Sequence, residues 1–355
     1  MEEKWSESSN AIRPLSLRRF DIAPPAWNLP MTSWLNRAES IVVAGGLFFA
    51  LTVLPPVILT TRYQAQEQTC RDRLRHVGVA FAGYEQAHGG LPPRRTGFND
   101  GNPYGGWGEQ ILPHLGVTER IGQYDSDYDF FDPKNKAVVE SQLPELLCPS
   151  SPAGRAVEIQ SQASTKSLNP DKDTVFTCLA GSVDFISSNG VLLAREGYGL
   201  NALSQARNNG NQRQPMTDNE PSPLSRITDG LSNTLLLIEQ AGRPAVWRKK
   251  EQKPGAGQFG VSPNARGAWA GWGSIAFGAA NAETGETPGR GVGTDCSVNC
   301  NNWFGIYGFH PDGANVLFCD GSVRFVSTKL DPLTFAYLTI RDDGHIIEYE
   351  DFNKN

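Results

Sequence analysis

Hydrophobic and polar residues are unevenly distributed along this 355-residue chain, and one stretch near the N-terminus is almost wholly apolar. Residues 41–60, IVVAGGLFFALTVLPPVILT, carry no charged side chain. At about 1.5 Å per helical residue this run spans roughly 30 Å, the thickness of the hydrocarbon core of a bilayer. A buried helix of a soluble protein seldom runs this long without a polar face, so the run predicts a single transmembrane helix.

A second helical pattern follows this run directly. Apolar or small residues recur at spacings of three and four: Leu74, Val77, Gly78, Phe81 and Tyr84. This periodicity is typical of a helix with one buried face, and Gly89 and Gly90 before two prolines are typical of its end. We therefore expect residues 61–90 to continue the helix.

Beyond residue 91 the pattern favours strands and loops. Runs rich in β-branched and aromatic residues predict strands at 174–179, 183–186, 234–239 and 268–272. Asp320 and Gly321 separate two further runs, NVLFC and SVRFV, and an Asp-Gly pair supplies the positive φ angles of a two-residue hairpin turn. A short helix follows at 332–340, with Asp331 as its N-cap. The predicted fold class is α+β.

Composition and charge narrow the function classes. Hydrophobic residues make up 39% of the chain, enough to fill a core, and the formal net charge is -6. A mildly acidic chain lacks the clustered Lys and Arg that neutralise phosphates, so we expect no nucleic-acid partner. The sequence has no Gly-x-Ser-x-Gly elbow, P-loop, dinucleotide fingerprint or His-Glu-x-x-His motif. We therefore expect no enzymatic activity, no catalytic residue and no cofactor.

His310 is the residue that most invites a catalytic interpretation. With Asp312 and Asp320 it supplies an imidazole and two carboxylates, for a divalent metal or for acid–base chemistry in a hydrolase. The alternative is structural, with Asp320 as the turn residue and His310 hydrogen-bonding the backbone to hold that turn. We favour the structural interpretation.

An acidic segment resembles part of a calcium loop. Asp125, Asp127 and Asp129 alternate in the way that calcium-binding carboxylates do. Phe130 stands where such a loop needs glycine, however, and Lys136 stands where a bidentate glutamate would close it. We favour a solvated acidic loop and keep calcium binding as the alternative.

Trp269 and Trp272 lie three residues apart in the segment GAWAGWGS. Indole rings at this spacing can stack on a sugar or a peptide, but they more often pack in a core or on the surface of a sheet. We favour packing and keep glycan or peptide binding as the alternative.

All six cysteines follow the apolar run: Cys70, Cys148, Cys178, Cys296, Cys300 and Cys319. An even number suits disulfides in an oxidising compartment. The last three, together with His310, also suggest a zinc site, but their spacing is not that of a zinc knuckle and a disulfide is favoured. Six cysteines allow fifteen complete pairings, so the sequence leaves the connectivity open.

The C-terminal part of the chain resembles a known family. His310 is followed by nine residues and then by Asp320 and Gly321, within FHPDGANVLFCDGSVRFVS, which resembles the His-x9-Asp-Gly signature of the DUF1559 family. Four earlier segments are similar to the same family, in the same order: CRDRLRHVGVAFAGYEQAHGGLPP (70–93), WGEQILPHL (107–115), YDFFDPKNKAVVESQLPELLCPSSP (128–152) and ITDGLSNTLLLIEQAG (227–242). The resemblance covers residues 36–345. Proteins of this family are pilin-like, carry prepilin-type N-termini, are abundant in planctomycete-type bacteria, and have also been labelled solute-binding-protein-like.

The resemblance implies a pilin-like or pseudopilin-like fold, in which a long N-terminal helix packs on an antiparallel sheet domain with long loops. The implied divisions are a flexible cytoplasmic tail (1–40), a transmembrane helix (41–60), its continuation (61–90), an extracytoplasmic domain (91–345) and a second tail (346–355). In an oxidising space, this layout implies a disulfide between Cys70 and Cys148, and another between Cys296 and either Cys300 or Cys319.

The charged residues on either side of the apolar run predict the opposite orientation, with the C-terminal domain in the cytoplasm. Residues 21–40 carry a single basic residue, Arg37, whereas residues 61–80 carry four arginines, Arg62, Arg71, Arg73 and Arg75. The positive-inside rule alone would place the domain in the cytoplasm, but long domains translocate largely regardless of local charge. The resemblance therefore decides the expected orientation, with the C-terminal domain outside the cytoplasm.

The N-terminal match is partial. Pro56 and Cys70 keep the family's spacing, and Glu39 stands where its helix-start glutamate falls. Trp34 and Leu35 replace the Gly-Phe cleavage pair, and because prepilin peptidase needs a small residue at the cut, we expect an unprocessed single-pass anchor in the inner membrane. The implied function is that of a structural or interaction protein of the type II secretion or type IV pilus kind, with pilin-like or secretion-system subunits as partners. The alternative is an extracellular module that binds a glycan, a peptide or calcium.

Overall fold

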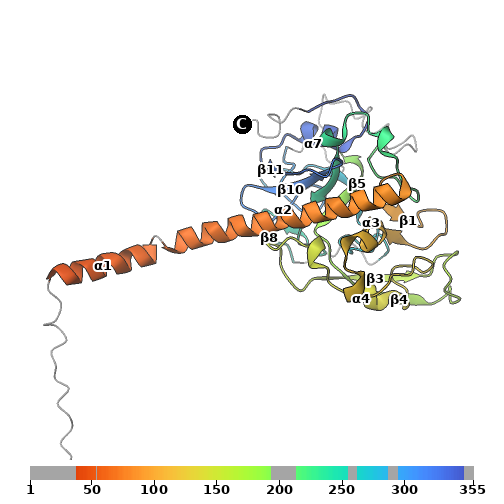
Figure 1. Ribbon diagram of the computed structural model, residues 1–355, viewed down its shortest axis with the longest axis horizontal. Coiled ribbons are helices and arrows are strands. Elements are labelled where there is room, and N and C mark those ends of the chain that lie inside the picture. The colour runs from red at the N-terminus through yellow and green to blue at the C-terminus, as the bar shows by residue number, and fades with distance from the viewer. Residues whose placement is uncertain (1–36, 53, 193–212, 255–261, 287–294, 348–355) are drawn as a thin grey trace, which may run out of the picture. The chain divides into compact units, whose positions relative to one another are not determined.

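The computed structural model describes residues 37–52, 54–192, 213–254, 262–286 and 295–347 (Figure 1). The chain divides into two compact units, Met1–Ile58 and Leu59–Asn355. The first unit holds helix α1 and the first residues of helix α2, and the second holds every strand that is described. The residues at which we predicted the loss of processing, Trp34 and Leu35, lie outside the described part of the chain.

Helix α1 (Arg37–Thr52) covers the first half of the apolar run. Leu47, Phe48 and Leu51 on this helix are 58%, 70% and 74% exposed. Among the described residues we find no helix that is both long enough and apolar enough to cross a membrane. The described residues of the run predicted as a transmembrane helix belong to α1 and α2, and residue 53 between them lies outside the described part of the chain.

Helix α2 (Leu54–His88) carries the predicted amphipathic stripe into the domain. Four stripe residues are buried in the main core: Leu74, Val77, Phe81 and Tyr84. Gly78 completes the stripe, because a Cβ there would lie 3.0 Å from Cδ1 of Leu317 on strand β10 (Gly313–Phe318). The helix ends at His88, and Gly89 adopts a φ of 74°, which confirms the predicted glycine stop.

A five-stranded sheet lies at the centre of the second unit, in the order β11-β10-β6-β5-β9 (Figure 1). Besides β10, its strands are β5 (Phe185–Leu192), β6 (Leu235–Glu239), β9 (Ser274–Gly278) and β11 (Val323–Ser327). All neighbours are antiparallel except β5 and β9, which are parallel. The α+β class with an antiparallel sheet is therefore confirmed, with this one parallel edge pair as an addition.

The predicted hairpin is formed by β10 and β11. Asp320 Oδ1 accepts a hydrogen bond of 2.8 Å from the Ser322 amide, and Gly321 has a φ of 83°. The turn is longer than the two residues predicted, because the last strand pair is Leu317 with Val323. Only Gly321 in this turn has a positive φ. Asp320 and Gly321 therefore stabilise the turn through one Asx hydrogen bond and one glycine conformation.

Shorter elements surround the sheet. The remaining strands pair as β1 (Arg95–Thr96) with β2 (Gly105–Gly106), β3 (Ala156–Gln162) with β4 (Val175–Gly181), and β7 (Trp247–Arg248) with β8 (Glu251–Gln252). Short helical turns are α3 (Trp107–Gln110), η1 (Leu112–Leu115), α4 (Thr118–Ile121), α5 (Lys136–Val139), η2 (Pro144–Leu146), η3 (Leu224–Arg226) and η4 (Leu231–Asn233). Helix α7 (Pro332–Thr339) begins where predicted, and Asp331 Oδ2 accepts hydrogen bonds from the amides of Leu333 and Thr334. The strand predicted at 268–272 is wrong, because this segment consists of turns and β9 begins only at Ser274.

The segment 268–272 turns because another backbone lies against it. A Cβ on Gly106 would lie 1.9 Å from the carbonyl oxygen of Gly271, and a Cβ on Gly108 would lie 2.0 Å from that of Trp269. These separations are far below van der Waals contact, so both positions require glycine. Trp107, between them, is 1% exposed and packs against Phe81 of α2 with ring centroids 5.4 Å apart.

Candidate functional site

Four segments that are distant in the sequence bring a thiol pair, a carboxylate and an imidazole together in the core. Helix α2 supplies Cys70, the loop after η2 supplies Cys148, the last residue of β6 supplies Glu239, and the loop before β10 supplies His310. One potential ligand atom from each residue lies within 4.8 Å of the other three. All four side chains are buried, and Cys70 and Glu239 are fully inaccessible to solvent. We call these four residues the thiol–histidine cluster.

His310 lies between a sulfur and an oxygen of this cluster. Its Nε2 is 3.3 Å from Cys148 Sγ and 3.4 Å from Glu239 Oε1. The other carboxylate oxygen, Oε2, accepts a hydrogen bond of 2.9 Å from the Asn315 amide on β10. Oε1 has no well-formed hydrogen bond within the described residues, although it is buried. A single nitrogen, His310 Nε2, thus faces both Cys148 Sγ and Glu239 Oε1. Each of these two atoms needs a hydrogen-bond donor or a cation as its partner.

The environment raises the pKa of both thiols and of the imidazole in the cluster. Burial raises the pKa of the Cys70 thiol to about 11 and holds the pKa of Cys148 well above its ordinary value. For His310, burial alone lowers the pKa, but hydrogen bonds to Cys148 and Glu239 outweigh it and raise the pKa to about 10. Without a bound cation, the cluster at neutral pH therefore contains two thiols and an imidazolium beside a carboxylate.

Asp184 holds the Cys148 side of the cluster. This buried carboxylate accepts hydrogen bonds of 2.9 Å from the Cys148 amide, 2.6 Å from the Ser151 hydroxyl and 2.8 Å from the Arg155 guanidinium. Its second oxygen accepts the Gly242 amide at 3.1 Å. Asp184 therefore fixes the loop that carries Cys148 against β5 and the segment after β6.

Lys250 holds the His310 side. Its ammonium donates hydrogen bonds to the carbonyl oxygens of Gly308 and His310, the latter at 2.9 Å. Burial lowers the pKa of Lys250 to about 8, while the nearby Glu239 carboxylate favours its charged form. The cluster is thus flanked by one ammonium that contacts the backbone of its histidine.

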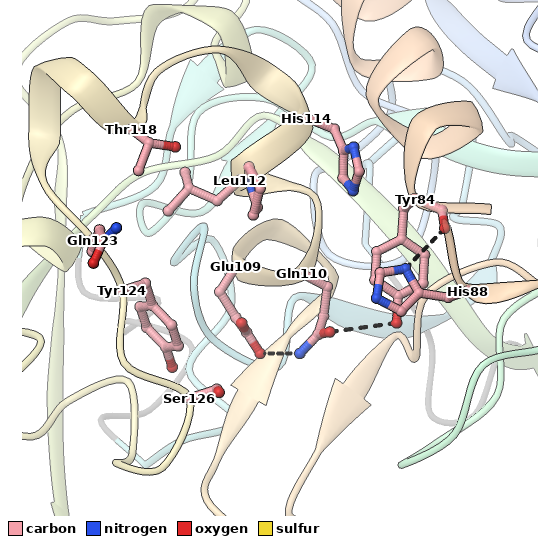
Figure 2. A pocket seen from close by; sticks show the side chains of 11 residues that line it. Tyr84, His88, Glu109, Gln110, Leu112, His114, Thr118, Gln123, Tyr124 and Ser126 are labelled. Atoms are coloured by element: carbon pink, nitrogen blue, oxygen red, sulfur yellow. Dashed lines mark hydrogen bonds between the residues drawn. The ribbon is translucent and has the colours of Figure 1, made fainter. Parts of the chain in front are cut away.

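A separate, open pocket of about 430 Å³ lies beside the C-terminal end of α2 (Figure 2). Its lining residues are Tyr84, His88, Glu109, Gln110, Leu112, Pro113, His114, Thr118, Gln123, Tyr124 and Ser126. Glu109 Oε1 accepts a hydrogen bond of 2.5 Å from Gln110, and Gln110 Oε1 lies 3.5 Å from the Tyr84 hydroxyl. The Tyr84 and His88 rings stack with centroids 4.0 Å apart. The pocket therefore combines aromatic faces with a connected set of polar groups.

Burial raises the pKa of Glu109 in this pocket to about 8, against an ordinary value of 4.5, although the Gln110 hydrogen bond opposes the shift. Between these two pH values the folded protein binds more protons than the unfolded chain, so its stability falls as the pH rises through this window. The Glu109→Gln variant should match the wild type near pH 5 and be the more stable of the two above pH 8. Thermal unfolding midpoints followed by circular dichroism measure this.

The matched control for that experiment is Glu119→Gln, at an exposed glutamate on α4. It should leave the pH profile of the midpoint as it is in the wild type. If the unfolding midpoint of Glu109→Gln changed with pH in the same way as that of the wild type, this would contradict a buried, protonated carboxyl at Glu109.

The structure corrects the partners that the sequence suggested for His310. Asp312 and Asp320 are exposed, and Asp320 lies beyond the far end of β10. Because a strand rises about 3.3 Å per residue, the six residues of β10 separate the histidine from the turn by roughly 20 Å. His310 therefore neither joins these carboxylates nor holds the hairpin turn. It faces Cys148 and Glu239 instead.

The acidic segment is held by hydrogen bonds within the protein. Asp129 is fully buried and its two oxygens accept the amides of Tyr104 and Ser164, at 2.9 and 3.0 Å. Asp125 Oδ1 accepts the Asp127 amide at 3.2 Å. Across the described ranges, the thiol–histidine cluster is the one group of side chains arranged to hold a metal ion. Nothing in this geometry favours the calcium alternative.

The two tryptophans are packing residues. Trp269 is 1% exposed and its Nε1 donates to the Ser141 carbonyl at 3.0 Å. Trp272 is 8% exposed and donates to the Thr96 carbonyl at 2.6 Å. Their burial removes the stacking surface on which the glycan interpretation depended.

The cysteines divide into one disulfide and four thiols. Cys296 and Cys300 are joined, as one of the predicted pairings has it, so these two are not zinc ligands. Cys178 and Cys319 are free and lie outside the thiol–histidine cluster. The predicted disulfide between Cys70 and Cys148 is wrong, because both are free thiols, although the structure places them in one cluster.

Glu239 and Glu109 are the site residues that the sequence reasoning missed. Glu239 ends the strand LLLIE, in which every residue is buried, and a carboxylate in such a run signals a specific partner. Glu109 lies in WGEQILPHL, between a buried Trp107 and a buried Leu112. In each case the signal was an ionisable residue inside an otherwise apolar segment.

Comparison with known proteins gives one match. The model of a family described as a protein of unknown function (DUF1559) matches residues 61–333, a range that contains both the thiol–histidine cluster and the pocket. No curated protein and no solved structure matches the chain.

Proposed function

We propose that this chain, which belongs to the DUF1559 family, is a membrane-anchored structural or interaction protein whose folded domain lies outside the cytoplasm. In this proposal it resembles type II secretion pseudopilins or type IV pilins in layout and keeps its N-terminus unprocessed. Other pilin-like or secretion-system subunits are the proposed partners.

One observation carries the proposal: the same helix belongs to the core of the domain and begins in an exposed apolar stretch. Cys70, Leu74, Val77, Phe81 and Tyr84 of α2 are part of the buried core. Val57, Ile58 and Leu59 near its start are 50%, 60% and 51% exposed. Apolar area left in water costs about 25 cal/mol per Å², so such a stretch is stabilised by lipid or by other apolar helices.

Burial of His310 favours a structural role over a hydrolase. The imidazole is 1% exposed and its neighbours in the cluster are buried as well. A general base must reach the proton that it removes, directly or through one water. We therefore propose no catalytic step at this histidine.

Charged residues in the apolar stretch should release the protein from the membrane. The full chain with both Leu47→Lys and Phe48→Lys should move from the carbonate-washed membrane pellet to the soluble fraction, because lysine near the centre of a span costs about 2.5–3.5 kcal/mol. The control is Val79→Lys, at a 66% exposed residue of α2 within the domain, which should stay in the pellet. Recovery of the wild-type chain in the soluble fraction would overturn the anchor.

A second candidate function is ligand binding outside the cell, and the pocket of Figure 2 favours it. The exposed His88 ring beside Glu109, Gln110 and His114 suits the ring faces and hydroxyl groups of a glycan, or an aromatic peptide side chain. Titration calorimetry with oligosaccharide and peptide panels tests it. A ligand whose binding is lost in His114→Ala but kept in His76→Ala, at an exposed histidine of α2, would support this function, and the absence of any binder would remove it.

A further inference from the structure

We propose that Cys70, Cys148, Glu239 and His310 bind one zinc ion, which cross-links helix α2 to the sheet and to the two loops that carry Cys148 and His310. This inference goes beyond the proposed function, since it assigns a metal site and does not depend on the membrane anchor. The ligand types suit Zn²⁺, which takes thiolate, imidazole and carboxylate ligands in fourfold coordination.

The separations between the side chains match a tetrahedral site. Zn²⁺ binds sulfur at about 2.3 Å, and imidazole nitrogen and carboxylate oxygen at about 2.0–2.2 Å. Tetrahedral angles then place the sulfur and the nitrogen about 3.6 Å apart, and the nitrogen and the oxygen about 3.4 Å apart. The observed distances are 3.3 Å from Cys148 Sγ to His310 Nε2 and 3.4 Å from His310 Nε2 to Glu239 Oε1.

Buried polar atoms at the cluster lack well-formed hydrogen bonds. Glu239 Oε1 is buried and has no well-formed hydrogen bond within the described residues, and the same holds for both side-chain polar atoms of Asn315. Asn315 is fully buried and its carboxamide interacts with the Cys70 thiol. A buried carboxylate oxygen without a well-formed hydrogen bond is costly, and a cation at the centre of the cluster would stabilise it.

The charges around the cluster also fit a bound zinc ion. Zinc binds cysteine as thiolate and histidine as neutral imidazole. The ion, two thiolates and the Glu239 carboxylate then sum to one negative charge. The Lys250 ammonium, which donates to the His310 carbonyl, neutralises it.

A Cys70–Cys148 disulfide is the competing state of these sulfurs. It would form one S–S bond, release two protons and pass two electrons to an external oxidant. It would leave Glu239 Oε1 and His310 Nε2 facing each other, whereas zinc uses all four side chains. Four ligands of three types, converging from four segments, favour the metal.

The test is the zinc content of the full chain, purified from membranes without added metal or reductant and measured by inductively coupled plasma mass spectrometry. We expect about one zinc per chain. Cys148→Ser and His310→Gln should each lose most of it, whereas Cys178→Ser, at a buried thiol outside the cluster, should keep it. Zinc content that survives both cluster substitutions would overturn the proposal, as would a zinc-free wild type with Cys70 and Cys148 linked in non-reducing peptide mapping.

Cobalt substitution of the wild-type chain tests the metal site even if a variant does not fold. Replacement of the zinc by Co²⁺ should give the visible bands of tetrahedral cobalt and a near-ultraviolet thiolate-to-cobalt transition. Octahedral bands without a thiolate transition would overturn the site. The thermal unfolding midpoint should also fall after removal of the metal with a chelator, and an unchanged midpoint would overturn the cross-linking role.

Discussion

The Asp184→Asn variant is expected to lose about 3–5 kcal/mol of its free energy of unfolding, the usual result of removing one partner from a buried ion pair. Asp184 is fully buried and accepts hydrogen bonds from Arg155, Ser151 and the Cys148 amide. The side-chain nitrogen of an asparagine at this position would face hydrogen-bond donors where an acceptor is needed. The Arg155 guanidinium would also lose the carboxylate with which it pairs. Denaturant unfolding followed by circular dichroism measures the change.

The control for this prediction is Glu145→Gln, in the pair that Glu145 forms with Arg120 on the surface. An exposed ion pair contributes little because water and salt screen it, so this variant should unfold almost as the wild type does. If the two variants lost equal free energy, Asp184 would not be the structural centre of the Cys148 loop. If the account holds, Asp184→Asn should also lower the zinc content, since it releases the loop that carries a ligand.

The Gly108→Ala variant is expected to lose about 3 kcal/mol or more, a large effect for the addition of one methyl group to a packed core. Helix propensity alone predicts a gain in stability instead of a loss. Alanine in a helix is favoured over glycine by about 1 kcal/mol, and Gly108 lies in α3. The clash decides the sign. The new Cβ would lie 2.0 Å from the Trp269 carbonyl oxygen, and a backbone atom cannot rotate away as a side chain can.

Gly273→Ala is the matched control, because the nearest atom to a Cβ there is Trp107 Nε1, at an ordinary 3.7 Å. It should fold with nearly the stability of the wild type. A Gly108→Ala protein as stable as Gly273→Ala would show that α3 does not press against the 268–272 segment. Denaturant midpoints for the two variants, measured side by side, decide between these outcomes.

Local elements of this fold were predictable because neighbouring residues determine them. The stripe on α2, the glycine at its end and the Asp331 cap each act within one or two helical turns. The Asp320-Gly321 turn was predictable for the same reason. The segment 268–272 was not, because its apolar residues are buried by contact with Gly106 and Gly108, and β propensity cannot distinguish such turns from a strand.

The site was only half predictable. The sequence singled out His310 and, separately, the pair Cys70 and Cys148, but it gave His310 the wrong partners. Cys148 is 162 residues from His310, and only the tertiary fold brings them together. Asp320 attracted attention because it is close to His310 in sequence, yet an extended strand between the two residues carries them apart.

The most direct test of the proposed function is the topology of the chain in the membrane, read by protease digestion of bacterial spheroplasts that express it with a different tag at each end. The account predicts that the C-terminal tag is digested while the spheroplasts are intact, whereas the N-terminal tag becomes accessible only after lysis. A C-terminal tag that stays protected until lysis would contradict the account, because the domain would then lie in the cytoplasm.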